Sequence, residues 1–185
     1  TAGYIIQNLN SMPYSFYCMN GDLLLDIDLQ KLITESTSVP SSLIGSIEVE
    51  DPTRYGVLQI TEENKVESFI EKPDDDSFGK KISLGLYHFY KKDLQKIVSN
   101  LEAPCSFEHD VFPRLAEQNL LYTYTVTGKM IDVGTLESYI SSHLNGANNW
   151  ISHNNVSLST SATIINSVVL DKCIIGDELI IEDSI

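Results

Sequence analysis

Short apolar runs alternate with amphipathic stretches through the first 145 residues of the chain. Runs of Val, Ile, Leu and aromatic residues bounded by turn residues predict strands at 15–19, 42–50, 56–61, 65–70, 82–90 and 121–127. Helical spacing predicts helices at 1–10, 28–35, 91–101, 108–118 and 134–143. The polar turn at 62–64 joins two of the strands into a hairpin. Strands that alternate with helices predict an α/β layer with a mostly parallel sheet and one antiparallel insertion.

The pattern changes at about Asn145, where residues 145–149 have the composition of a linker. Beyond it, two rows of residues recur every six positions: Val156, Ala162, Val168, Ile174 and Ile180, and then Ser167, Cys173, Leu179 and Ile185. Neither a helix nor a strand has this period, whereas a repeat does. The row predicts hexapeptide coils with apolar residues stacked inside; the alternative is chance in a Val/Ile-rich tail. We therefore expect two domains, residues 1–145 and 146–185.

Composition narrows the possible functions. The 185 residues include 26 acidic and 12 basic side chains, for a formal charge of −14. This excess argues against a nucleic-acid or membrane-surface binder, because phosphate groups repel it. The three cysteines are scattered and form no CxxC pair, so we expect neither a zinc site nor a disulfide framework, and a cytoplasmic protein. Since the chain opens at Thr1 rather than Met, we expect a piece of something longer.

Two aspartates stand where predicted strands end. Asp22 follows the strand at 15–19 and the flexible Gly21, and Asp132 follows an apolar triplet and precedes Gly134. Ligands of open α/β sheets bind beyond the carboxyl ends of strands, and carboxylates suit a hard divalent cation. The two acids are therefore candidates to share one metal ion that neutralises phosphate oxygens. The alternatives are an ordinary turn at Asp22 and a helix-capping role for Asp132.

Further candidates lie around the hairpin. Glu71 and Lys72 end its second strand before Pro73, and a lysine there is a candidate phosphate partner in so acidic a chain. The alternative is an exposed Glu/Lys pair. Gly85 interrupts an apolar strand and Gly56 begins another, and glycine in a strand often marks the close approach of a ligand or of another backbone.

Five stretches in order carry a family resemblance: NGD at 20–22 with DIDL at 26–29, RYGV at 54–57 with FIEKP at 69–73, SLGLY at 83–87, EHDVFP at 108–113 and IDVGT at 131–135. Together they resemble the motifs of the sugar-phosphate nucleotidylyltransferases. The resemblance implies a Rossmann-like mixed sheet with helices on both faces, followed by the start of a left-handed β-helix. It also implies formation of an NDP-sugar and pyrophosphate from an NTP and a sugar-1-phosphate, in nucleotide-sugar biosynthesis.

The same resemblance assigns expected roles to residues. Asp22 and Asp132 would hold Mg²⁺, Glu71 would bind sugar hydroxyls, and Lys72 would bind the sugar phosphate. Gly21, Gly56 and Gly85 would let the substrate approach the backbone. With Lys72, the two aspartates form the expected catalytic set. The implied partners are the NTP, the sugar-1-phosphate and a second copy of the chain, bound through the β-helix.

The resemblance begins downstream of one family segment. Thr1-Ala2-Gly3 is similar to a stretch that follows the family's glycine-rich loop, which cradles the triphosphate. Met130 also stands where the family usually has Trp. A second hypothesis is therefore a non-catalytic regulatory or assembly subunit with the same fold. The acids at 22 and 132 and the lysine at 72 favour the enzyme, because a purely structural copy has no need of them.

Overall fold

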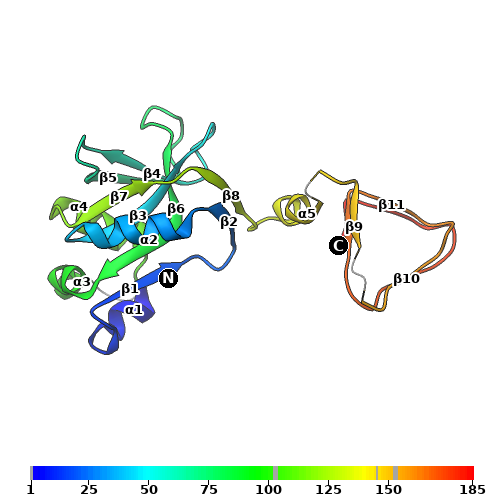
Figure 1. The fold of residues 1–185 in the computed structure, drawn as a ribbon, viewed down its shortest axis with the longest axis horizontal. Coiled ribbons are helices and arrows are strands. Elements are labelled where there is room, and N and C mark those ends of the chain that lie inside the picture. Colours follow the sequence, from blue (N-terminus) through cyan, green and yellow to red (C-terminus); the bar gives the residue numbers. More distant parts are fainter. Residues whose placement is uncertain (1, 102–103, 145, 152–153) are drawn as a thin grey trace. The chain divides into compact units, whose positions relative to one another are not determined.

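A computed structural model describes residues 2–101, 104–144, 146–151 and 154–185 (Figure 1). The chain forms two compact units. The first contains the residues up to Gly21 together with Leu25–Met130, and the second contains Asp22–Leu24 together with Ile131–Ile185. The expected domain boundary at Asn145 lies outside the described residues, and the division at 145/146 stays a prediction.

The first unit is built on a six-stranded mixed sheet. Its strands are β1 (Ser15–Met19), β3 (Ser42–Glu48), β4 (Gly56–Ile60), β5 (Val66–Glu71), β6 (Lys81–Tyr90) and β7 (Leu121–Thr125). The order is β5-β4-β6-β3-β7, with β1 paired to β6. β3 and β7 are parallel, and the other pairs are antiparallel.

One expectation about this sheet is corrected. The prediction of a mostly parallel sheet was wrong, because β6 runs antiparallel to β1, β3 and β4, and alternation of strands with helices does not fix strand direction. β1 is only partly buried, since Tyr17 and Met19 are 42% and 53% exposed. The hairpin of β4 and β5 is confirmed, with Gly56 opposite Glu71.

Helices cover both faces of the sheet. The helical segments of this unit are α1 (Gly3–Gln7), η1 (Leu9–Ser11), α2 (Leu29–Ser38), α3 (Lys91–Ile97), η2 (Val98–Asn100), the π-turn η3 (Phe107–Val111) and α4 (Phe112–Glu117). Adjacent residues of β4 point to opposite faces, so that Val57 packs in a cluster with Leu32 of α2 while Leu58 packs in another with Leu94 of α3. Asp28 caps α2: its Oδ1 accepts from the Lys31 N–H at 3.0 Å.

A strand that the sequence analysis did not predict follows the NGD stretch. β2 (Leu23–Ile27) pairs with β8 (Gly128–Asp132) in a two-stranded ribbon that is divided between the two units. Its side chains alternate between half-buried and exposed. A ribbon of this kind depends on pairing with a distant segment, which local apolar content does not reveal.

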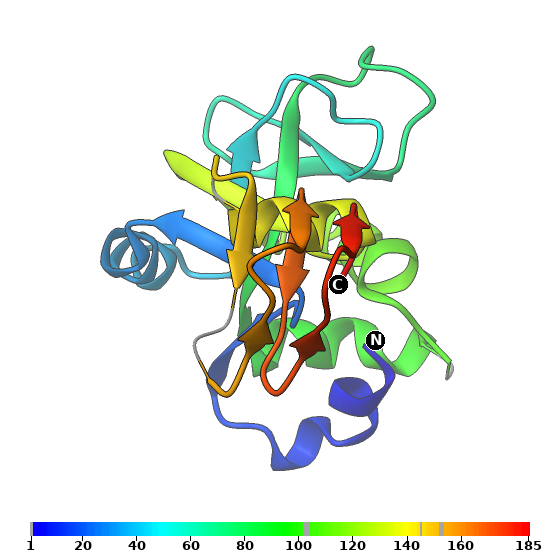
Figure 2. The same cartoon turned by 90° about the vertical axis from the view of Figure 1, so that its right-hand side faces the viewer.

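The second unit carries α5 (Leu136–Leu144) and a coil of short parallel strands (Figure 2). These strands are β9 (Asn149–Ile151), β10 (Ser157–Leu158), β11 (Thr163–Ile165), β12 (Ser167–Val169), β13 (Ile174–Ile175) and β14 (Ile180–Glu182). β9 pairs with β12, β10 with β13, and β11 with β14, all in parallel.

The expected inward stacking of the first row of period six holds only in part: Val156 and Ala162 are half-buried. Val168 is buried, in a cluster with Ile140 and Leu144 of α5. Ile174 and Ile180 of the same row are 83% and 74% exposed, whereas their neighbour Ile175 is buried. Successive strand residues alternate between two faces, so the choice of the inward row depends on register and not on apolar content.

No helix among the described residues combines the length and the apolar character needed to cross a bilayer.

Candidate functional site

Asp22 and Asp132 come together in the second unit. The Val133 N–H donates to the backbone carbonyl of Asp22 at 2.8 Å, which ties the two segments side by side. A Cβ placed on Gly134 would lie 2.9 Å from Asp132 Oδ1 and 3.9 Å from Asp22 Oδ2. The two carboxylates therefore border one small volume, and the glycine leaves that volume open.

The donor set of this pair fits magnesium. Mg²⁺ prefers oxygen ligands and is usually held by one or two carboxylates, with the remaining positions filled by substrate phosphates and water. Within the described part of the chain, no three or more His, Cys, Asp or Glu side chains form a group that could hold a metal ion. A metal bound by Asp22 and Asp132 would thus take its other ligands from phosphate oxygens and water.

Asp132 also serves the turn that begins α5. Its Oδ1 accepts a hydrogen bond from the Gly134 N–H at 2.9 Å, which forms a turn ahead of the helix. The helix-capping role considered as an alternative belongs instead to Thr135, whose Oγ1 accepts from the Ser138 N–H at 3.1 Å. A carboxylate has two oxygens and about four acceptor sites, so the turn and metal binding are compatible.

Glu71, at the end of β5, is a half-buried carboxylate of the first unit. Its side chain is 21% exposed. Burial raises the pKa of Glu71, and the charge of Glu108 raises it further, while Lys72 and His109 oppose the shift. Glu71 is therefore a poorly solvated acceptor, which gains most from a ligand that donates hydrogen bonds.

Lys72 presents an exposed ammonium beside this carboxylate. Its side chain is 67% exposed, and its Nζ lies 3.7 Å from Glu71 Oε1, which is the ion pair considered as an alternative. The backbone is strained, with φ at +46° immediately before Pro73, and the Lys72 N–H donates to the Tyr55 carbonyl at 3.1 Å. Such strain persists where neighbouring structure enforces it, and it is frequent at ligand sites.

The three glycines differ in what the structure shows of them. At Gly56 an added Cβ would overlap the Phe69 ring, so packing within the hairpin accounts for this glycine. At Gly21 an added Cβ would meet no atom within 4 Å. The expectation that both glycines admit substrate to the backbone stays a prediction.

Gly85 lies in a bulge of β6. The register between β3 and β6 shifts between the pairs Ile44↔Tyr87 and Ser46↔Ser83, and Gly85 has a φ of +74°. Its carbonyl accepts a hydrogen bond from the Asn20 N–H at 2.9 Å. The bulge thereby fixes the backbone at the start of the NGD stretch, which explains why a residue without a Cβ stands there.

Apart from Lys72, the groups that interact electrostatically with Glu71 were not predicted from the sequence. Burial strongly raises the pKa of Tyr87 on β6, and the charges of Glu108 and Glu71 raise it further, whereas a hydrogen bond to Ser83 opposes the shift. Glu108 and His109 belong to η3. Glu108 lies in the EHDVFP stretch, and that motif was the one signal that could have identified it.

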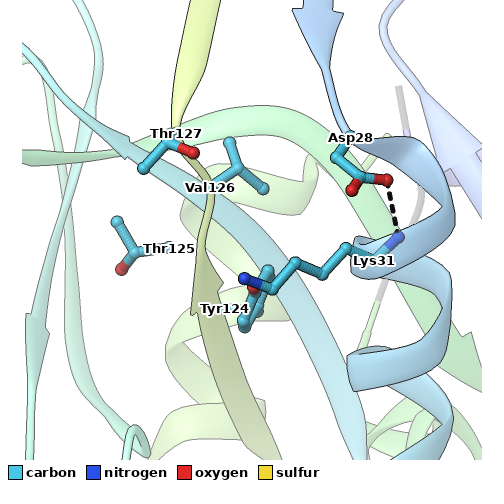
Figure 3. A pocket seen from close by; sticks show the side chains of 6 residues that line it. All are labelled: Asp28, Lys31, Tyr124, Thr125, Val126 and Thr127. Atoms are coloured by element: carbon cyan, nitrogen blue, oxygen red, sulfur yellow. Dashed lines mark hydrogen bonds between the residues drawn. The ribbon is translucent and has the colours of Figure 1, made fainter.

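A separate pocket lies beside the start of α2 (Figure 3). It encloses about 60 Å³ and is lined by Asp28, Lys31, Tyr124, Thr125, Val126 and Thr127. A hydrogen bond with the Tyr124 hydroxyl raises the pKa of Lys31. None of the candidate site residues lines this pocket, and its volume is far below the roughly 300 Å³ at which ligand pockets usually begin.

Comparison with known proteins finds a matching family model and several relatives of this chain. The family model described as nucleotidyl transferase matches residues 1–149. A probable mannose-1-phosphate guanylyltransferase 3 of Arabidopsis thaliana is 31% identical over 88% of this chain and 49% of its own length. The mannose-1-phosphate guanylyltransferase catalytic subunit beta of Drosophila pseudoobscura pseudoobscura is 32% identical over 71% of this chain and 35% of its own length. The chain thus spans a third to a half of these curated relatives.

Two solved structures share the fold. HddC from Yersinia pseudotuberculosis matches with a TM-score of 0.60 and 29% identity, over 75% of this chain and 59% of that one. A putative glucose-1-phosphate thymidylyltransferase from Bacillus anthracis, in complex with a sucrose, matches with a TM-score of 0.68 over 80% and 61%. Because the second is 18% identical, it supports the fold alone.

Proposed function

This chain belongs to the nucleotidyl transferase family, and we propose that it carries part of an enzyme that makes an NDP-sugar from an NTP and a sugar-1-phosphate. In that reaction a phosphate oxygen of the sugar-1-phosphate attacks the α-phosphorus of the NTP. A new P–O bond forms, the bond to the bridging oxygen breaks, and pyrophosphate leaves. Such a transfer depends on positioning and charge neutralisation more than on covalent help from the protein.

The observation that carries the proposal is the convergence of Asp22 and Asp132 around Gly134. These residues would hold Mg²⁺. When bound, the ion would neutralise charge on the phosphate oxygens. Asp132 also holds the turn at Gly134 through its Oδ1, so one of the two carboxylates is fixed before any ligand binds.

The first unit supplies the groups proposed to bind the sugar-1-phosphate. The exposed ammonium of Lys72 suits the phosphate, and the half-buried carboxylate of Glu71 suits the hydroxyl groups of the sugar. The names of the curated relatives favour GTP and mannose 1-phosphate as the first pair of substrates to test.

The C-terminal coil is proposed to be the start of a left-handed β-helix, and a second copy of the chain is its proposed partner. Three pairs of parallel strands support this assignment. In each pair the two strands belong to successive turns of the coil. The exposed Ile174 and Ile180 side chains offer apolar surface for such a contact. We place the protein in the cytoplasm on its cysteine usage alone.

The second candidate function is that of a non-catalytic regulatory or assembly subunit with the same fold. Under this reading the chain binds a metal ion or sugar phosphate but forms no nucleotide sugar by itself.

The conservative substitution Asp132→Asn tests the enzyme proposal. Asn keeps an oxygen that accepts from Gly134 but loses the negative charge, so we expect the fold to persist and Mg²⁺-dependent pyrophosphate release from GTP and mannose 1-phosphate to fall by about 100-fold or more. Binding of Mn²⁺, followed by electron paramagnetic resonance, should weaken in parallel. The matched control is Asp183→Asn, an aspartate of the same unit that hydrogen-bonds Asn166 in the coil.

The outcomes separate the two functions. Unchanged turnover in Asp132→Asn would remove Asp132 from the metal site. An intact wild-type protein that binds Mn²⁺ and the sugar phosphate but releases no pyrophosphate would support the regulatory subunit.

A further inference from the structure

Thr135 and Ser138 bind each other at the start of α5. The Ser138 N–H donates to Thr135 Oγ1 at 3.1 Å, and the Thr135 N–H donates to Ser138 Oγ at 3.1 Å. The Ser138 hydroxyl also donates to the Thr135 carbonyl at 3.0 Å, and the two hydroxyl oxygens lie 3.2 Å apart. This reciprocal pattern is that of a capping box, with Ser in place of the usual Glu or Gln. We call this pair the cap of α5.

The cap completes a row of occupied backbone N–H groups. Residues 133, 134 and 135 donate in turn to the Asp22 carbonyl at 2.8 Å, to Asp132 Oδ1 at 2.9 Å and to Ser138 Oγ at 3.1 Å. The first acceptor belongs to the NGD stretch, and the last belongs to α5. The segment that follows Asp132 is therefore held at both ends.

Gly134 is the link between the cap and the two carboxylates. Its N–H holds one oxygen of Asp132, and a Cβ at this position would lie 3.9 Å from Asp22 Oδ2. Glycine has more backbone freedom than any other residue and no side chain that packing could hold. The direction of the Gly134 N–H, and with it that of the Asp132 carboxylate, is therefore set by the hydrogen bonds on either side of it.

Packing does not fix the first turn of α5. Thr135, Leu136 and Glu137 are exposed, and the first buried residue of the helix is Ile140. The helix has 9 residues, too few to be stable on its own. Without a side-chain acceptor, N–H groups of a first turn are left unpaired and the turn opens readily. The cap is therefore the main restraint on this turn.

We propose that Thr135 and Ser138 are positioning residues for the proposed metal site. By closing the first turn of α5 they hold Gly134, and the Gly134 N–H keeps the Asp132 carboxylate on the volume that it shares with Asp22. Both residues act through the backbone, and neither is a ligand of the ion. The inference rests on the proposed function, which places Mg²⁺ between the two carboxylates.

Four substitutions in the full chain test this role. Ser138→Ala and Thr135→Val each remove one hydroxyl of the cap, whereas Thr135→Ser keeps the hydroxyl. Ser141→Ala is the matched control, because it removes a serine hydroxyl of the same helix that donates to the Ser138 carbonyl and takes no part in the cap. Circular dichroism checks that each variant is folded at the temperature of the assay.

Two measurements separate the cap from the metal ion. Exchange of the Gly134 amide proton with solvent, followed by NMR, reports whether the hydrogen bond to Asp132 stays closed, and it needs no metal. Mn²⁺ binding, followed by electron paramagnetic resonance, reports on the metal site. Ser138→Ala is also combined with Asp132→Asn, because an effect that passes through the Asp132 carboxylate must vanish when its charge is gone.

Loss of either hydroxyl of the cap should open the Gly134 hydrogen bond and weaken Mn²⁺ binding. We expect Ser138→Ala and Thr135→Val to speed the exchange of the Gly134 amide. The Mn²⁺ dissociation constant should rise by about three- to tenfold, because the binding-competent fraction of the chain falls. Thr135→Ser and Ser141→Ala should match the wild type in both measurements. In the Asp132→Asn background, Ser138→Ala should cause no further loss of affinity.

Each contrary outcome has a distinct meaning. Unchanged Mn²⁺ affinity in Ser138→Ala and Thr135→Val would overturn the positioning role and leave the metal site intact. A loss in Thr135→Val alone would overturn it as well, since the Thr135 hydroxyl would then act on the ion directly. An equal loss from Ser138→Ala in both backgrounds would show that the effect bypasses Asp132. If the amide exchange responds but the wild-type chain binds no Mn²⁺, the cap holds Gly134 as inferred and the proposed function fails.

Discussion

The carboxylates of Asp22 and Asp132 meet at a glycine. Both place an oxygen within 4 Å of the point where a Cβ of Gly134 would stand, and the Asp22 backbone carbonyl is bonded to Val133. The space between them therefore exists because residue 134 has no side chain. A side chain at residue 134 should therefore disturb any metal ion held between them.

Gly134→Ala should weaken metal binding with little loss of fold. The added methyl group would stand 2.9 Å from Asp132 Oδ1, so that carboxylate must shift, and the shift is cheap because it moves the end of a side chain. We expect the Mn²⁺ affinity to fall by at least about tenfold, measured by electron paramagnetic resonance. Gly176→Ala is the control in the same unit, because its Cβ would make only an ordinary contact with Leu179. Equal affinities in all three proteins would contradict the proposed metal site.

Gly56→Ala should destabilise the first unit through Phe69. The new methyl group would overlap the Phe69 ring, and overpacking of this kind costs about 1–3 kcal/mol. The free energy of unfolding, measured with urea, should recover in the double variant Gly56→Ala/Phe69→Leu relative to the sum of the single changes. Additive losses would show that the ring is not the cause.

Two substitutions of Lys72 should separate the effect of its backbone strain on stability from the effect of its ammonium on phosphate binding. Its φ of +46° is costly for any residue with a Cβ, so Lys72→Gly should be more stable than Lys72→Ala by about 1 kcal/mol in urea unfolding. Both variants lose the ammonium and should bind glucose 1-phosphate equally weakly in calorimetry. Lys80→Ala removes another exposed lysine, paired with Glu50, and serves as the control for net charge. Retained affinity in both Lys72 variants would exclude this lysine from phosphate binding.

His88 should make stability depend on pH. The side chain is 2% exposed, and burial lowers the pKa of His88 below its ordinary 6.5, although the hydrogen bond between its Nδ1 and the Ser36 carbonyl partly offsets this. His88 therefore binds a proton more readily in the unfolded chain than in the folded chain. The stability that neutral His88 contributes is fully present above pH 6.5. It is lost as the pH falls from there through the pKa of His88 in the folded chain.

The variant His88→Asn checks this dependence. Asn keeps a side-chain N–H for Ser36 but does not titrate, so its melting temperature should fall less than that of the wild type between pH 7 and pH 5. His143→Asn, on α5, should retain the dependence of the wild type. Identical slopes for His88→Asn and the wild type would show that other groups carry the effect.

Local pattern was sufficient for the hairpin, which needs only two apolar runs and a polar turn. It also made Asp22 and Asp132 candidates to share one metal ion, and the resemblance of five short motifs added the expectation that this ion is Mg²⁺. Their common position at Gly134 is what the structure contributes.

Features that depend on distant partners were beyond local pattern. The direction of β6 and its bulge at Gly85 follow from pairing with β1 and β3, and no pattern within β6 specifies them. The π-turn η3, which carries Glu108, is a geometry that sequence spacing does not predict. The exposure of Ile174 and Ile180 reflects a register that apolar content leaves undetermined.

The bulge at Gly85 has a consequence for engineering. Its carbonyl extends the β1–β6 pairing to Asn20, so the middle of a core strand also sets the backbone ahead of Gly21. A redesign that straightened β6 to gain thermal tolerance would release that anchor. Improved heat resistance would then come with altered chemistry, and residue 85 should be left untouched in any library aimed at robustness.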